Sequence, residues 1–387
     1  MTRDAHTRIE GVTGLSHDDA IARVLRRVRP WVEIETPSRN EMAITALSER
    51  IEGELHALGA TCDAMPAPGF GRNLAAVVHG REPHLEPIVV LGHIDTVHPL
   101  GTLHHQPYDV VDGRATGPGI FDMKAGIAVV IEAIALLVGR GARPRRTVRL
   151  LVTCDEEIGS HASHALIREA AQGAAAALVP EPSLPDGSVK TRRKGVSTYR
   201  LNVAGRAAHA GVDPERAISA VAELAHQILA VLDAADHTRG TTINVGMVAG
   251  GTASNVVPAS ATASIDVRFA TADEGERVHA VLTALAPKLP GAALHIERTE
   301  TRPPLVRTDG VARLFEHART QAAELGVSLG EGATGGGSDG SLIALYGLPV
   351  LDGLGPRGGG AHAADEHILI EDLPFRLALF CRLLETL

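Results

Sequence analysis

A histidine and an aspartate, two residues apart, follow a short apolar stretch of the chain. Residues 88–91 are typical of a buried strand, and His93 and Asp95 come directly after them. Residues two apart in an extended chain project to the same side, so these side chains are expected to lie together where the strand ends. A metal-binding imidazole commonly donates its second N–H to a carboxylate, which fixes the ring. We therefore interpret His93 as a metal ligand and Asp95 as the residue that orients it.

Further acids and a second histidine lie at the ends of other predicted elements. In open α/β sheets, ligands bind outside the carboxyl ends of the strands. The candidates at such ends, or just ahead of a predicted helix, are Asp122, Glu156, Glu157, Glu181 and His362. Carboxylates crowded together repel one another, and they persist mainly where a cation neutralises them. The pattern therefore predicts a divalent metal centre.

The ligand types indicate the metal and the chemistry. Mixed histidine and carboxylate ligation fits Zn²⁺ or a similar borderline divalent ion, such as Co²⁺ or Mn²⁺. Five ligands are too many for one open catalytic zinc, but they suit two metals that share a carboxylate, for which Asp122 is the natural bridge. One of the adjacent residues Glu156 and Glu157 then ligates while the other acts as a base, and the residues alone leave open which. The predicted reaction class is metal-assisted hydrolysis.

The elements that must position these residues alternate between strands and helices. Predicted strands cover residues 74–78, 88–91, 147–153, 175–179 and 348–351. Predicted helices cover residues 20–32, 44–58, 124–138, 311–325 and 372–387. This alternation predicts an α/β fold with a mostly parallel sheet and helices on both faces. Residues 1–18 are expected to be a frayed lead-in.

The pattern changes between about residues 195 and 301. Strands at 197–204, 241–248, 261–269 and 293–298 and helices at 214–233 and 273–289 follow the order β-α-β-β-α-β, which is the ferredoxin-like arrangement. We therefore predict three segments in two domains. Residues 1–194 and 303–387 form the catalytic metal-binding domain, and residues 195–302 form an inserted α+β domain.

Composition and charge exclude several classes of protein. The 387 residues carry a net charge of −9 (37 basic against 46 acidic), which argues against nucleic acid or an anionic membrane as the main partner. The three cysteines, Cys62, Cys154 and Cys381, form no disulfide framework. The chain also lacks a signal-peptide pattern and an apolar run long enough to span a bilayer. We therefore expect reduced thiols and a cytoplasmic location.

Four motifs resemble the dizinc exopeptidase and amidohydrolase family, which includes glutamate carboxypeptidases, aminoacylases, dipeptidases and succinyl-diaminopimelate desuccinylase. These motifs lie at residues 92–97, 119–126, 155–160 and 181–183. The segments 253–258, 266–268 and 334–339 are particularly similar to the bacterial glutamate carboxypeptidases. The resemblance implies a zinc-exopeptidase-like fold in which the inserted domain serves for dimerisation or as a lid.

The resemblance also implies roles for the metal-site residues. Asp122 bridges two zinc ions, His93 and Glu181 complete one site, and Glu157 and His362 complete the other. It assigns Glu156 as the general base and Asp95 as the orienter of His93. It further implies that His209, on the inserted domain, reaches across a homodimer to stabilise the tetrahedral oxyanion in the partner subunit's site.

A free carboxylate on the substrate requires a cationic fork, which arginine supplies. By the resemblance, Arg268 and Arg302 bind this carboxylate with Asn255 beside them. The backbone of the glycine-rich loop, formed by Thr334, Gly335, Gly336 and Gly337, lies against the substrate. The sequence departs from the carboxypeptidases in the basic stretch 190–195, where Lys190 lies near the position of a second substrate-binding lysine, and in the loop 355–362, which contains an additional Arg357.

We therefore predict a cytoplasmic, homodimeric, two-zinc hydrolase that cleaves the amide bond to a C-terminal amino acid with a free carboxylate, glutamate or a similar residue. The substrate is a small molecule or a peptide, and neither nucleic acid nor a membrane is a partner. The alternative within the family is an N-acyl amino acid deacylase or a dipeptidase. More distant alternatives are a ureido or allantoate-type amidohydrolase and a catalytically inactive binding protein.

Overall fold

The computed structural model describes residues 3–387, and the chain divides into two compact units. Unit 1 holds the chain up to Arg192 together with Arg307–Thr334 and Ser338–Leu387, and unit 2 holds Arg193–Val306 and Gly335–Gly337. The domain limits predicted from the sequence, 194/195 and 302/303, are close to these limits. The catalytic, dimerisation and lid roles assigned to the two domains stay predictions.

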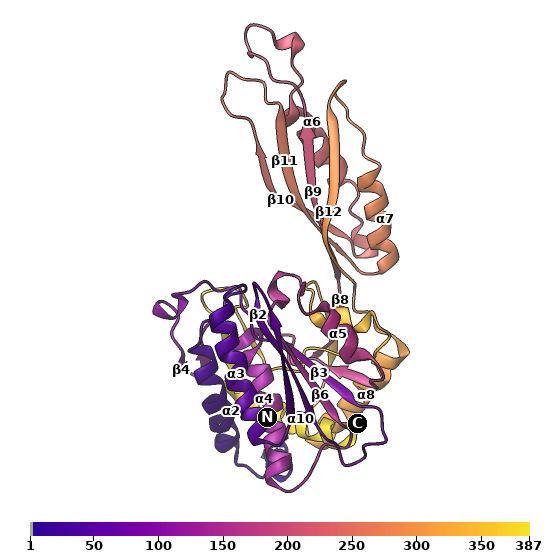
Figure 1. Ribbon diagram of the computed structural model, residues 1–387. Helices are drawn as coiled ribbons and strands as arrows, with labels where there is room; N and C mark the ends of the chain where they lie inside the picture. Colours follow the sequence, from indigo (N-terminus) through magenta and orange to yellow (C-terminus); the bar gives the residue numbers. More distant parts are fainter. Residues whose placement is uncertain (1–2) are drawn as a thin grey trace. The chain divides into compact units, whose positions relative to one another are not determined.

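A six-stranded sheet forms the centre of unit 1, in the order β1-β2-β6-β3-β7-β14 (Figure 1). Strands β6, β3, β7 and β14 are parallel, whereas β1 pairs with β2 and β2 with β6 in antiparallel fashion. The mostly parallel sheet predicted from the sequence is therefore confirmed. The strands are β1 (Thr61–Ala67), β2 (Gly71–Val78), β3 (Ile88–His93), β6 (Val148–Thr153), β7 (Ala176–Leu178) and β14 (Val350–Leu351).

Helices cover both faces of this sheet, as the alternation of side chains along β6 shows. Val148, Leu150 and Val152 belong to the large apolar core that also contains α4 (Ala125–Gly139), α2 (His17–Val32) and α10 (Leu373–Thr386). Arg149 lies on the opposite face, where its guanidinium donates to backbone oxygens at the end of α5 (His164–Ala171). Unit 1 also contains α3 (Glu41–Ala57), α8 (Asp309–Glu324) and α9 (Asp339–Ala344).

The N-terminal segment differs from the expectation. Helix α1 (Arg3–Thr13) replaces the predicted frayed lead-in, so that prediction is wrong, while residues 1–2 lie outside the described part of the chain. Ala5, Ile9 and Thr13 are buried on one face of this helix, and Ile9 joins the core of unit 1. The spacing of four places these residues on one stripe of the helix. In the sequence, the polar residues between them make this stripe difficult to recognise.

Unit 2 contains the predicted β-α-β-β-α-β module, folded as an antiparallel sheet in the order β10-β11-β9-β12. Its core comes from inward-facing residues of the sheet and from the two helices that follow β9 and β11. Helix α6 starts six residues later than predicted because Ser219 caps it, accepting from the Ala222 N–H. The elements are β9 (Gly195–Ala204), α6 (Ala220–Leu232), β10 (Thr242–Gly250), β11 (Ser260–Phe269), α7 (Ala272–Thr283) and β12 (Ala293–Arg302).

Two small sheets in unit 1 lie outside the strands predicted from the sequence. Strands β15, β16, β5 and β4 form one of them, and β13 and β8 form the other. The first supports the chain on either side of His362. None of the helices in residues 3–387 combines the length and apolar character needed to cross a bilayer, and Cys62, Cys154 and Cys381 are free thiols. The strands are β4 (Asp109–Val111), β5 (Arg114–Thr116), β8 (Val189–Arg193), β13 (Glu331–Thr334), β15 (Gly358–Gly359) and β16 (His367–Leu369).

Candidate metal centre

The predicted ligands lie where the parallel strands of unit 1 end. His93 is the last residue of β3 and pairs in register with Thr153, the last residue of β6. Glu157 follows β6, Glu181 follows β7 and His362 follows β14. Because these strands are parallel, their carboxyl ends share one edge of the sheet, where residues far apart in sequence can meet.

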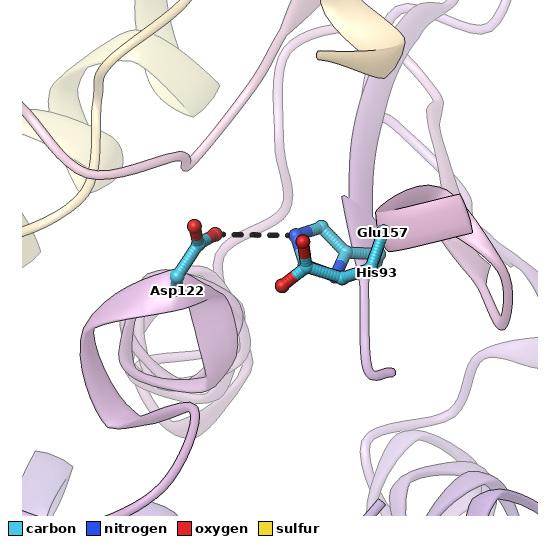
Figure 2. Close-up of side chains that lie close together, drawn as sticks. All are labelled: His93, Asp122 and Glu157. Atoms are coloured by element: carbon cyan, nitrogen blue, oxygen red, sulfur yellow. Dashed lines mark hydrogen bonds and ion pairs between the residues drawn. The ribbon is translucent and has the colours of Figure 1, made fainter. Parts of the chain in front are cut away.

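Three of these residues form a compact group. The ligand atoms of His93, Asp122 and Glu157 all lie within 4.8 Å of one another, and Figure 2 shows the three side chains directed toward a common point. His93 Nε2 and Asp122 Oδ1 are 3.3 Å apart. Such a cluster of one imidazole and two carboxylates is a candidate metal site.

The two oxygens of Asp122 face different histidines. Oδ1 lies 3.3 Å from His93 Nε2, and this nitrogen also lies 3.7 Å from Glu181 Oε1. Oδ2 lies 3.4 Å from His362 Nε2, which in turn lies 3.1 Å from Glu157 Oε2. The structure thus brings all five predicted ligands together and divides them into two groups, with Asp122 common to both.

The electrostatics of this cluster favour positive charge. Hydrogen bonds to Asp122 and Glu157 raise the pKa of His362 to about 10. Burial raises the pKa of Glu157 to about 7, and the nearby carboxylates contribute to this shift. Burial also opposes ionisation of Asp122, but its hydrogen bonds to His362 and His93 outweigh burial and hold its pKa well below the usual range. An opposite charge next to a carboxylate stabilises its ionised form, so the site attracts cations.

The donor set fits a divalent transition metal. Two imidazole nitrogens and three carboxylates, all on one edge of unit 1, are the ligands found around Zn²⁺ and similar borderline ions. No thiol enters the set, because Cys154 packs in the apolar core and burial raises the pKa of its thiol far above the usual value. The residues present are therefore suited to hold a metal without a soft ligand.

Asp95 connects His93 with the turn that carries the paired glutamates. The Nδ1 of His93 lies 3.0 Å from the backbone oxygen of Asp95 and 3.4 Å from its Oδ1. The fully buried carboxylate of Asp95 accepts the backbone N–H groups of Glu156 and Glu157 at 3.0 and 3.2 Å, and the Ser38 hydroxyl at 2.8 Å. Asp95 therefore contacts the imidazole mainly through its backbone, while its carboxylate fixes the turn.

Glu156 lies beside the predicted ligands. It opens the short turn Glu156–Ile158 and is almost completely buried. Its charge contributes to raising the pKa values of both His93 and Glu157, which places its side chain in their electrostatic neighbourhood. Its assignment as the general base stays a prediction.

Sequence reasoning missed two residues behind the metal site. Glu366 is fully buried and accepts backbone N–H groups from the turn that contains Asp122. Lys124 is also fully buried, with Nζ donating to the backbone oxygen of Ile34, and burial lowers its pKa to about 7. The motif at 119–126 contains Lys124, two residues after Asp122, so the sequence does carry a signal for this residue. Glu366 carries no signal in the sequence that separates it from a solvated loop acid.

The predicted substrate residues on unit 2 fall into two groups. Arg268 and Arg302 pair in register with the same residue of β9, Val196, and a Cβ at Gly337 would lie 3.3 Å from the Arg302 side chain. His209 pairs with Val256 in the loop at the other end of β11, where the Ala210 N–H donates to the Asn255 backbone oxygen.

These two groups lie at opposite ends of the sheet of unit 2. Asn255 precedes the start of β11 at Ser260, whereas Arg268 lies near its end. At about 3.3 Å per residue, the strand separates them by roughly 25 Å. Asn255 therefore does not lie beside Arg268 within one subunit. His209 and Asn255 are exposed to solvent, as is His362 among the predicted metal ligands, whereas His93, Asp122, Glu157 and Glu181 are buried or partly buried.

The guanidinium of Arg268 is already engaged. Its Nε and one terminal nitrogen donate to the two carboxylate oxygens of Asp266 at 2.8 and 2.9 Å, and the other terminal nitrogen lies 3.3 Å from the Gly335 backbone oxygen. Arg193 holds the same glycine-rich loop, donating to the backbone oxygens of Gly336 and Gly337. Thr334 belongs to unit 1, at the end of β13. The substrate roles of these residues stay predictions.

A parallel α/β sheet with histidines and carboxylates at its strand ends, interrupted by an antiparallel α+β unit, defines the class of metallo-exopeptidases and amidohydrolases. The chain matches Peptidase family M20/M25/M40 over residues 89–386, and it belongs to this family. Members of this family depend on a metal, and the candidate site here is His93, Asp122 and Glu157. The protein is therefore a metal-dependent hydrolase.

Individual relatives agree with this assignment. The chain is 33% identical to carboxypeptidase G2 of Pseudomonas sp. (strain RS-16) over 371 residues, which cover 94% of this chain and 89% of that protein. It is 29% identical to the succinyl-diaminopimelate desuccinylase of Rhodospirillum centenum, covering 87% of this chain and 91% of that protein.

A solved structure shows the same fold. A tripeptidase from Staphylococcus aureus matches with a TM-score of 0.78 and 22% identity, covering 94% of this chain and 98% of that chain.

Proposed function

We propose that this protein hydrolyses the amide bond between an acyl group and a C-terminal amino acid with a free carboxylate, glutamate or a similar residue, and that it uses two zinc ions. The observation that carries the proposal is the division of the ligands around Asp122. His93 and Glu181 would hold one ion together with Asp122, and His362 and Glu157 would hold the other together with the same aspartate.

The chain's own residues have separate tasks in this reaction. When bound, paired divalent ions polarise the scissile carbonyl and lower the pKa of a water molecule. Glu156 would take a proton from that water and return it to the leaving amine, which is the work of a general base and acid. Asp95 would keep Glu156 in place, because its carboxylate accepts the Glu156 N–H.

Recognition of a free carboxylate would come from unit 2. Arg302 and Arg268 flank the same position of β9, next to the glycine-rich loop. Arginine suits this task because its planar fork binds carboxylates with two hydrogen bonds. A substrate carboxylate would have to share the Arg268 guanidinium with Asp266 and the Arg302 guanidinium with Glu300, whose Oε1 lies 3.6 Å from Arg302 Nε. We therefore assign the contact to the two arginines together. The relative named carboxypeptidase G2 favours this substrate class.

We further propose that the protein is a homodimer joined through unit 2. Strand β10 is an edge strand, and its Met247 and Val248 are exposed by 68% and 58%. Helix α6 exposes Val221, Leu229 and Leu232 on one stripe. An unpaired strand edge beside exposed apolar side chains is suited to pairing with a second copy. The separation of His209 from Arg268 supports the same proposal, since one subunit cannot bring both to a small substrate.

The experiment is a hydrolysis screen of purified protein loaded with zinc, cobalt or manganese. We expect cleavage of N-acyl-glutamates and of peptides that end in glutamate, with lower rates for aspartate and apolar residues. Loss of activity on chelation and recovery on adding zinc would support the metal role. Absence of hydrolysis with every metal would contradict the proposal.

A second candidate is deacylation of N-acyl amino acids, because several relatives are named succinyl-diaminopimelate desuccinylase. N-succinyl and N-acetyl amino acids in the same screen separate this activity from carboxypeptidase activity. Dipeptides test the dipeptidase alternative. Release of ammonia from ureido substrates tests the alternative of a ureido or allantoate-type amidohydrolase.

A further inference from the structure

Four polar groups converge on the buried carboxylate of Glu366. Its Oε1 accepts the backbone N–H groups of Phe121 at 2.9 Å and Asp122 at 3.0 Å. Its Oε2 accepts the Gly119 N–H at 2.9 Å and lies 2.5 Å from His98 Nε2. Glu366 itself is fully buried, and His98 is nearly so. A carboxylate without such partners would be costly to bury.

The three N–H donors belong to the turn that carries Asp122. In this turn, Asp122 has φ −115° and ψ 93°, and Met123 also departs from helical values, before α4 begins at Ala125. The N–H groups of an irregular backbone segment ahead of a helix have no hydrogen-bond partner within that helix. Glu366 accepts these groups from more than two hundred residues away in sequence. Hydrogen bonds to an ionised acceptor are stronger than those between neutral groups, so this carboxylate restrains the turn.

Glu366 also connects this turn to the loop of His362. The two residues are four positions apart, and the loop folds back on itself through hydrogen bonds from Ala363 N–H to the Gly360 oxygen and from Glu366 N–H to the Ala363 oxygen. His362 Nε2 lies 3.4 Å from Oδ2 of the Asp122 side chain, while Glu366 accepts the Asp122 backbone N–H. One loop therefore contacts both ends of the same residue.

We propose that Glu366 is a positioning residue of the metal centre, and that it fixes the Asp122 carboxylate in the place from which it serves both halves of the site. This inference rests on the proposed function, because it assumes that Asp122 binds metal. Groups that orient metal ligands without touching the metal typically change metal affinity or activity by about 10- to 100-fold when they are replaced. We expect an effect of that size for Glu366.

Replacement by glutamine tests the arrangement with little change in volume. Both carboxylate oxygens accept hydrogen bonds, and an amide offers only one oxygen. If the amide oxygen accepts the N–H groups of Phe121 and Asp122, the NH₂ group faces the Gly119 N–H. Two donors then face each other, and the hydrogen bond from Gly119 is lost. His98 can adopt the other tautomer and accept from the amide. Glu366→Gln therefore weakens the clamp without leaving a cavity.

The measurement is zinc affinity of the metal-free full-length protein, determined by competition with a chromophoric chelator. We expect about 10- to 100-fold weaker binding in Glu366→Gln, together with an altered visible spectrum of the cobalt-loaded protein. Equal affinity and an unchanged cobalt spectrum would overturn the inference. If the unmodified protein itself binds no divalent metal, the proposed function fails instead, so the two failures are distinguishable.

A matched control lies in unit 2. Glu223 is also fully buried and accepts the backbone N–H groups of Lys288 and Leu289 and the side chain of Gln227. Glu223→Gln is expected to lower the unfolding temperature of the metal-free protein and to leave zinc affinity unchanged. A general loss of packing would lower both variants' unfolding temperatures, but it would not lower zinc affinity in Glu366→Gln alone.

A second variant keeps the test decisive if Glu366→Gln does not fold. His98→Phe removes one partner of Oε2 and retains a planar ring and all three backbone donors. We expect a smaller loss of zinc affinity, severalfold rather than the full effect, because Glu366 is then held by fewer contacts. Unchanged zinc affinity and an unchanged cobalt spectrum in His98→Phe would in that case overturn the inference.

Discussion

The two units hold their predicted functional residues in different ways. In unit 1, Asp95 and Glu366 are fully buried, and each carboxylate accepts several hydrogen bonds from the backbone next to a predicted ligand. In unit 2, His209 and Asn255 are exposed, and the contacts of their segment are mainly between backbone groups. The backbone around the candidate metal centre is thus held by buried carboxylates of its own unit, although His362 is exposed, whereas His209 lies in an exposed segment, as the proposed role across a dimer would require.

This difference indicates where precision is needed. Metal ligands must be held within narrow limits of position, and buried hydrogen-bonded supports provide that. A residue that joins the site only after assembly or substrate binding can remain exposed until then. The comparison therefore predicts that changes in unit 1 affect metal binding and chemistry within a subunit, and that changes at His209 affect catalysis through a second copy.

The largest expected effect comes from Glu156→Gln. This variant should retain both metals, because Glu156 is not among the proposed ligands, and it should lose turnover by about 10²- to 10⁴-fold, as expected for removal of a general base. Metal content by elemental analysis and kcat on the best substrate are the two measurements. Full turnover with metals bound would refute the base assignment, whereas loss of metal would make Glu156 a ligand.

The next effect tests whether unit 2 acts across subunits. His209→Ala should lower kcat by about 10²- to 10³-fold, the size expected for one oxyanion donor, with little change in KM. Mixing refolded Glu156→Gln and His209→Ala subunits gives a sharper test. If His209 serves the partner's site, each mixed dimer regains one intact site, and the mixture recovers up to about a quarter of normal activity, since half of randomly paired dimers are mixed. No recovery despite proven mixed dimers would place His209 within its own subunit or outside the reaction.

The metal ligands could be predicted from the sequence because they follow strands. His93, Glu157, Glu181 and His362 each come after a strand of a predicted parallel sheet, and the rule that such ends share an edge brings them together. Glu366 could not be predicted, because three of its four partners are backbone N–H groups, which every residue except proline has. A carboxylate that recognises backbone leaves no trace in the side chains of its partners.

Other misses have similar physical reasons. Strand β1 is not among the predicted strands. It contains Pro66 and an exposed Asp63, which are unusual in a strand, and both are tolerated because β1 is an edge strand. The separation of Asn255 from Arg268 follows from the β10–β11 register, which pairs Gly250 with Ala261 at one end and Thr242 with Arg268 at the other. The sequence predicts both strands but not which end of the sheet faces a ligand.

A third prediction concerns an ion pair in unit 1 that supports the loop before the last helix. Asp372 accepts from the Arg376 Nε at 2.7 Å and from the Arg357 N–H at 2.9 Å, and Arg376 is fully buried. Burial opposes ionisation of Asp372, but the two arginines and the backbone N–H of Arg357 outweigh burial and lower the pKa of Asp372. Asp372→Asn should reduce the free energy of unfolding by about 3–5 kcal/mol at pH 7, as for a broken buried pair.

The sign of the pH dependence follows from the lowered pKa. The ionised form of Asp372 stabilises the fold fully above its unfolded pKa of about 3.9, and the contribution is lost as the pH falls through the folded value. The free energy of unfolding can be measured with urea at pH 7 and at pH 3. The difference in this free energy between Asp372→Asn and the unmodified protein should therefore be smaller at pH 3. Asp63→Asn, at an exposed position, serves as the control. An equal difference at both pH values would exclude the ionised carboxylate as the cause.

The smallest expected effect tests how closely the metal edge of unit 1 is packed. Gly126 lies in the first turn of α4, four residues after Asp122, and a Cβ there would be 1.8 Å from the backbone oxygen of Pro180, next to Glu181. Gly126→Ala must displace α4 or the Glu181 segment, so we expect a loss of about 1–3 kcal/mol in the free energy of unfolding and weaker zinc binding. Gly53→Ala, in α3 with open space around it, should instead be neutral or stabilise by about 0.5–1 kcal/mol. Because the strain in Gly126→Ala arises between two segments that carry metal ligands, unchanged zinc affinity alongside reduced stability would mean that the ligands tolerate movement of the backbone behind them. That result would contradict the preorganisation that distinguishes unit 1 from unit 2.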